Sequence, residues 1–163
     1  MTLTTHAIVG ATLATLVPNN PVLGFAIGFG SHYLLDAIPH WAYPVAGLEK
    51  DKENSLNTKM VISKTSHKDL LKVCADGICG LIFSFLILGG IFHHDLAMIL
   101  MGALGGMLPD LLQFCYWMWK PKILKPLQML HNWAHTSMRI DDKPVIGVLS
   151  QLAIIAFVVL IFK

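Results

Sequence analysis

The sequence predicts an all-α integral membrane protein, a single domain over residues 1–163 built as a bundle of about five transmembrane helices. Hydrophobic residues make up 55% of the chain and charged residues only 13%, whereas a soluble domain usually has about a quarter charged residues. The apolar residues also gather into helix-length segments separated by turn-forming or charged stretches. The net charge of +2 is too small to indicate a nucleic-acid partner, so the expected partner is the lipid bilayer.

Five apolar segments follow one another along the chain, at residues 5–17, 22–38, 70–92, 96–119 and 145–162. The first is short for a span, since crossing the hydrocarbon core takes about 20 residues. Pro18-Asn19-Asn20-Pro21 predicts a tight turn after it, and Pro39 ends the second segment. The last segment carries no charge and is the clearest transmembrane prediction.

Two longer polar connections, residues 40–69 and 120–143, separate these segments and indicate the orientation of the chain. They hold ten of the twelve Lys and Arg residues, and five crossings would place both connections on one side. By the positive-inside rule this side faces the cytoplasm. We therefore expect an integral protein of the inner or plasma membrane with both connections in the cytoplasm.

Polar residues that are unusual at membrane depth fall near this same face. They are His6, His32, Asp36, Asp76, Asp110, His131 and His135. Carboxylates and imidazoles at such depth are costly and are usually functional. Their gathering at one level predicts a metal centre that faces the cytoplasm.

Spacing supports this prediction in two places. His32 and Asp36 are four residues apart and share one helix face, so they can chelate one ion, or the carboxylate can orient the imidazole. A purely structural alternative is a hydrogen bond between helices. His131 and His135 have the same spacing and can bind zinc if their segment is helical. His40 follows Pro39 and is either a ligand or an ordinary interfacial histidine.

Two aspartates remain. Asp110 directly follows Pro109, whose ring disturbs a helix and can free carbonyl groups, so we interpret Asp110 as a ligand. The glycines before it, Gly102, Gly105 and Gly106, favour close helix packing. Asp76 lies too deep for a helix cap of its own segment and is expected to be a ligand or the partner of a histidine. Asp76 and His40 are the candidates for a catalytic general base.

These motifs resemble the membrane-bound metal-dependent hydrolase family, including its LexA-regulated members. The similar pieces are Thr5-His6, Ser31-His32-Tyr33-Leu34-Leu35-Asp36, Leu108-Pro109-Asp110 and His131-Asn132-Trp133-Ala134-His135-Thr136-Ser137. The resemblance implies metal binding by His6, His32, Asp36, Asp110, His131 and His135. In the family pattern the Ser-His…Asp piece comes last, the Leu-Pro-Asp piece continues Ile-Asp-His, and an arginine follows the first histidine of the third piece. This chain differs at all three points.

The function expected from the sequence is metal-dependent hydrolysis of a phosphoester in a lipid or another membrane-associated substrate. Zinc is the first choice of ion, with manganese or magnesium as alternatives. Lys and Arg residues of the two connections would attract anionic head groups. Two other readings stay open: a non-enzymatic protein that binds or transports a divalent metal ion, and a bundle held together by His–Asp hydrogen bonds.

Overall fold

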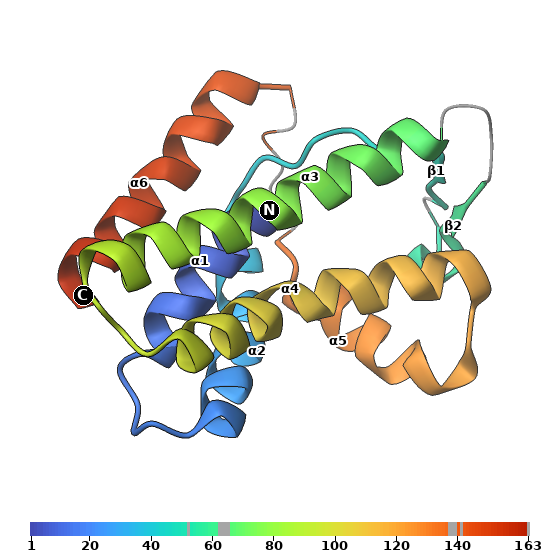
Figure 1. Ribbon diagram of the computed structural model, residues 1–163. Coiled ribbons are helices and arrows are strands. Elements are labelled where there is room, and N and C mark those ends of the chain that lie inside the picture. Colours follow the sequence, from blue (N-terminus) through green and yellow to red (C-terminus); the bar gives the residue numbers. More distant parts are fainter. Residues whose placement is uncertain (52, 62–65, 137–139, 141, 163) are drawn as a thin grey trace.

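The computed structural model describes residues 1–51, 53–61, 66–136, 140 and 142–162, and it is mostly helical (Figure 1). The helices are α1 (Leu3–Ala14), α2 (Pro21–Asp36), α3 (Ser66–Ser84), α4 (Leu96–Trp119), α5 (Lys125–Ala134) and α6 (Pro144–Phe162). A π-helical turn, η2 (Phe85–Ile91), continues α3, and the 3-10 turns are η1 (Ser55–Asn57) and η3 (Lys122–Leu124). The strands β1 (Leu48–Glu49) and β2 (Lys59–Met60) form a small antiparallel pair.

Helix starts follow from capping side chains. The Asn20 side chain accepts hydrogen bonds from the backbone of Val22 and Leu23, and Pro21 occupies the first helical position of α2. One oxygen of Asp95 accepts from the second and third residues of α4 in the same way. These groups satisfy N–H donors that a helix leaves unpaired. The tight turn expected between the first two segments is confirmed.

Three helices of the described chain are long and apolar enough to cross a membrane: His67–Ile91, Leu96–Trp119 and Pro144–Phe162. The expectation of about five spans is not confirmed. The 12 residues of α1 extend about 18 Å and the 16 residues of α2 about 24 Å, against a hydrocarbon core of about 30 Å. The turn between them divides the apolar sequence into two helices that are each too short.

The short helix α1 lies inside the bundle, in contact with α2, α3, α4 and α6 (Figure 1). Every residue from Thr5 to Thr12 is buried. Ala7 and Ala11 pack against Ile99 and Ala103 of α4 and Leu88 of η2 to form one core cluster. An apolar stretch of this length is more typical of a buried core helix than of a span.

Glycines let α1, α2 and α4 approach at backbone distance. A Cβ atom on Gly10 of α1 would lie 2.6 Å from the Gly102 carbonyl oxygen of α4, which real structures do not show. A Cβ atom on Gly28 or Gly106 would likewise overlap a backbone carbonyl of the facing helix. The packing role expected for the α4 glycines is therefore confirmed, and close approach of small residues is a usual way for membrane helices to associate.

We predict that Gly106→Ala destabilises the bundle, because its new methyl group would meet the His6 carbonyl group. Overpacking of this kind costs about 1–3 kcal/mol. Thermal unfolding in detergent should show a lower midpoint. The matched control is Gly30→Ala in α2, where a Cβ atom would have nothing within 4 Å. Equal midpoints for the two variants would contradict the proposed packing.

Candidate metal centre

Asp36, the last residue of α2, divides its two carboxylate oxygens between different imidazoles. Its Oδ2 lies 3.2 Å from His32 Nε2 and 3.4 Å from His131 Nε2. Its Oδ1 lies 3.2 Å from His6 Nε2 and 3.6 Å from His40 Nε2. The backbone nitrogen of Met1 is also 3.4 Å from Oδ1. Asp36 is thus the centre around which the histidines are arranged.

Asp110 on α4 divides its oxygens in the same way. Its Oδ1 lies 3.8 Å from His32 Nε2 and 3.7 Å from His131 Nε2. Its Oδ2 lies 4.0 Å from His6 Nε2. Both carboxylates therefore present one oxygen to the pair His32 and His131 and the other oxygen to His6.

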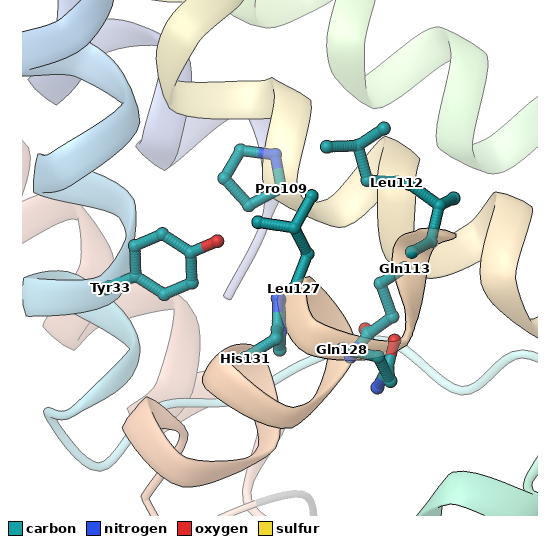
Figure 2. A pocket seen from close by; sticks show the side chains of 8 residues that line it. Tyr33, Pro109, Leu112, Gln113, Leu127, Gln128 and His131 are labelled. Carbon is teal, nitrogen blue, oxygen red and sulfur yellow. The ribbon is translucent and has the colours of Figure 1, made fainter. Parts of the chain in front are cut away.

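Four helices bring these side chains together. The glycine contacts place His6 of α1 against His32 of α2, with stacked rings whose centroids are 3.9 Å apart. His131 comes from α5, and Figure 2 shows it facing Tyr33 of α2 and Pro109 of α4. The rings of Tyr33 and His131 meet edge to face at 6.1 Å. The packing of α5 on α2 and α4 thus completes the cluster.

Backbone carbonyl groups orient three of the imidazole rings. His32 Nδ1 lies 2.8 Å from the Gly106 oxygen, His40 Nδ1 2.7 Å from the Ile38 oxygen, and His135 Nδ1 3.1 Å from the Thr136 oxygen. A carbonyl group only accepts hydrogen bonds, so in each ring Nδ1 carries the proton. Each Nε2 then keeps its lone pair free, which is the usual arrangement of a metal-binding histidine.

Several ring nitrogens of the cluster are buried without a hydrogen-bond partner among the described residues. The atoms concerned include His32 Nε2, His40 Nε2 and both ring nitrogens of His6. A buried polar atom without a partner costs about 1–3 kcal/mol. In His32 and His40 a nitrogen lone pair faces a carboxylate oxygen, and such a contact is favourable only if a proton or a cation lies between the two atoms. The cluster therefore requires either protonated imidazoles or a bound cation.

The distances fit a metal ion. Ligands about 2.0–2.2 Å from a tetrahedral zinc ion are about 3.3–3.6 Å from one another. The facing atoms of His32, His131, Asp36 and Asp110 are 3.2–3.8 Å apart. These four residues could hold a metal ion, and Asp36, His40 and His135 form a second donor group that shares Asp36.

Burial favours the neutral, metal-binding form of two of these imidazoles. Removal from water lowers the pKa of His40 to about 4 and the pKa of His131 to about 4. Both imidazoles are consequently neutral near pH 7, as metal coordination requires.

All six residues predicted as ligands come together. His6, His32, Asp36, Asp110 and His131 lie within one cluster, and His135 joins Asp36 in the second group. His40, predicted as a candidate base, also belongs to the second group. A signal for it was present, because His40 follows Asp36 at the same four-residue spacing as Asp36 follows His32.

Asp76, the other candidate base, lies outside both donor groups of the described chain. Its Oδ2 accepts from the backbone of Leu3 at 2.7 Å. Its Oδ1 accepts from the backbone and the hydroxyl group of Thr4 at 3.1 and 2.7 Å. These backbone N–H groups belong to the first turn of α1. The N–H groups of a first turn have no acceptor inside their own helix. The contacts of Asp76 are those of a cap supplied by another helix, and its role as a general base stays a prediction.

Loss of any one ligand should lower the metal content of the purified protein. We expect His32→Ala, Asp110→Ala and His135→Ala each to bind less zinc than the wild type in detergent, as measured by elemental analysis. His94→Ala is the control. It lies just before Leu96, and Asp110 is about 21 Å further along α4. Loss of metal from His94→Ala equal to the other losses would place the site elsewhere.

We further predict that Asp76→Asn lowers the thermal midpoint in detergent. An amide has one acceptor oxygen, so either Leu3 or Thr4 loses its partner, at about 1–3 kcal/mol. The control Asp95→Asn should be neutral, because Asp95 uses a single oxygen to cap α4 and asparagine caps equally well. A fully stable Asp76→Asn protein would contradict the capping role.

Comparison with known proteins adds no relative from which a role could be transferred. No protein-family model matches this chain, and no curated protein or solved structure is significantly similar to it.

Proposed function

We propose that this protein is a membrane-embedded phosphoester hydrolase with two divalent metal ions. The observation that carries the proposal is the division of the carboxylate oxygens of Asp36 between two sets of imidazoles, His32 and His131 on one side and His40 on the other. A carboxylate shared in this way is a natural bridge between two ions. Paired ions about 3.5–4 Å apart are used by phosphatases and nucleases to stabilise the attacking and leaving oxygens of an in-line displacement.

The donor chemistry favours zinc. His32, His131, Asp36 and Asp110 would hold the first ion with two nitrogens and two oxygens. Imidazole-rich sites suit zinc, whereas manganese and magnesium prefer sets made mostly of oxygen. His40, His135 and the second oxygen of Asp36 would hold the other ion. Bound ions would lower the pKa of a water molecule toward neutrality and polarise the phosphoryl oxygen.

The exposure of the site residues indicates the side from which a substrate can approach. The side chains of His6 and His32 are fully buried, whereas that of Asp110 is 24% exposed. His135 is also partly exposed. A substrate would therefore reach the centre from the side of Asp110 and His135. The buried side is dry, which strengthens electrostatic stabilisation of a developing negative charge.

Metal transport is the first rival reading. A transit pathway needs polar groups that continue through the membrane. The buried hydroxyl groups of Thr12 and Ser84 instead bond to carbonyl groups of their own helices, Ile8 and Gly80. Both donor groups found among the described residues share Asp36, and no further donor group in that part of the chain continues the path. This arrangement favours a site that serves chemistry.

A bundle held only by His–Asp hydrogen bonds is the second rival. Such a bundle would pair the buried ring nitrogens, but within the described chain His6 and His40 keep unpaired ones. The unpaired lone pairs favour a metal centre over this structural reading.

We also propose that the metal centre faces the cytoplasm. The lysines of the two long connections support this orientation. Three crossings by α3, α4 and α6 already bring both connections to one side, so α1 and α2 need not cross. Labelling of cysteines introduced at residues 53 and 122 should mark one side of the membrane, and His93 the other. Labels on opposite sides for residues 53 and 122 would overturn the orientation.

The purified, zinc-loaded protein should hydrolyse phosphoesters and contain two zinc ions per chain. His131→Ala and Asp36→Asn should lower the rate by about 100-fold or more, since even residues that only orient a metal ligand contribute about 10–100-fold. His94→Ala should keep the wild-type rate. The rate would be followed as released phosphate or alcohol over a panel of phospholipids and soluble esters. If the metal-loaded wild type hydrolysed no member of the panel, the proposed phosphoester hydrolase activity would be contradicted.

A further inference from the structure

A large cavity lies beside the metal centre, between α3 and α4, and the connection that carries β1 and β2 covers one end of it. Its volume is about 1380 Å³. Pockets for small molecules usually measure about 300–1,000 Å³, so this space exceeds what a phosphate group or a small head group needs. Figure 1 shows the β1–β2 hairpin beyond the start of α3 and the end of α4.

The lining of the cavity combines apolar side chains with several of the candidate metal ligands. Side chains from the facing sides of α3 and α4 supply an apolar lining, which includes Val73, Leu81, Leu104, Leu111 and Phe114. His40, Asp110, His131 and His135 line the same space, and Asp110 lies on α4 between Leu104 and Phe114. The partial exposure of Asp110 and His135 is consistent with an opening of the donor groups into this cavity.

Packed side chains close one end of the cavity. Leu81 and Phe85 pack against Leu88, Ile99 and Ala103 where α3 continues into η2 and α4 begins. The lining of α4 from Leu104 to Met118 extends about 21 Å. One leaflet contains about 15 Å of hydrocarbon, so a lipid chain can lie along this wall.

We propose that the cavity holds the hydrocarbon chain of a long-chain phospholipid substrate, with its phosphate group at the two donor groups. The proposal rests on the proposed hydrolase function and names the substrate class of that site. A water-soluble phosphoester would leave the apolar lining uncovered, whereas a lipid chain would cover it at about 25 cal/mol per Å². The cavity lies between two candidate spans, so a chain can enter from the bilayer.

The reaction then requires only water as co-reactant. The water oxygen bonds to phosphorus, the ester P–O bond breaks, and a proton from the water goes to the leaving alkoxide. Only the phosphate group has to reach the donor groups, and the chain stays in apolar surroundings throughout.

Binding can be tested without turnover. Metal-stripped protein in phosphatidylcholine nanodiscs would be irradiated with phosphatidic acid that carries a diazirine in its acyl chain. We expect crosslinks on cavity-lining residues such as Val73 and Leu104, competed by unlabelled phosphatidic acid. Val73→Trp and Leu111→Trp should each reduce them by about 10-fold, because indole would fill the space. The control Ile82→Trp changes an exposed residue of α3 outside the cavity lining and should crosslink as the wild type does.

Hydrolysis assays distinguish the proposed lipid-chain cavity from the proposed hydrolase function. With metal restored, Val73→Trp and Leu111→Trp should lose turnover of phosphatidic acid but keep turnover of glycerol 3-phosphate and their zinc content. The cavity assignment would be overturned if the variants lost or kept turnover equally on both substrates and crosslinks were confined to outward residues such as Ile82. That result would leave the proposed hydrolase activity standing. Competed crosslinks in the cavity without hydrolysis of any ester would support the lipid site and remove the hydrolase.

Discussion

The structure depends on buried imidazole nitrogens that face carboxylate oxygens away from water. Ring nitrogens of His32 and His40 meet oxygens of Asp36 at 3.2 and 3.6 Å, and their own protons are held on the opposite side by carbonyl groups. Such a contact repels unless a proton or a cation lies within it, and removal from water raises the cost. A bound divalent ion would turn the least favourable contacts of the bundle into its strongest. Folding and metal binding should accordingly be linked.

This constraint explains why α1 is short and buried. His6 can reach both carboxylates only if α1 lies between α2 and α4, and the glycine contacts make that approach possible. The first turn of α1 is then held from two sides. Asp76 of α3 caps its backbone, and Gln151 of α6 accepts from the Thr2 backbone at 3.0 Å and from the Thr5 hydroxyl group at 3.0 Å. Two helices that could cross the membrane thus position a third helix that is too short to do so.

The sequence predicted the helical class and the convergence of six ligand side chains, because charge at membrane depth is rare and i, i+4 spacing fixes a helix face. The sequence did not predict which carboxylate would serve which purpose. Asp76 and Asp110 look alike in an apolar segment, and only the approach of α1 decides that one meets backbone N–H groups and the other meets imidazoles. The expectation of about five spans is not confirmed, and here too hydropathy alone does not separate a buried core helix from a crossing one.

The place of the site in the bundle bears on its chemistry. Asp36 is the last residue of α2, whereas Asp110 lies nine residues inside the end of the candidate span Leu96–Trp119, and apolar residues of α3 and α4 line the cavity beside them. Hydrolysis of a soluble ester would require no such depth. Burial of four histidines and two carboxylates near the membrane would then cost free energy without helping the reaction. For a lipid, the same depth spares the chain from entering water. Under the proposed function, the position of the centre and the shape of the cavity beside it would both serve one requirement, that the reacting phosphate stays attached to the bilayer.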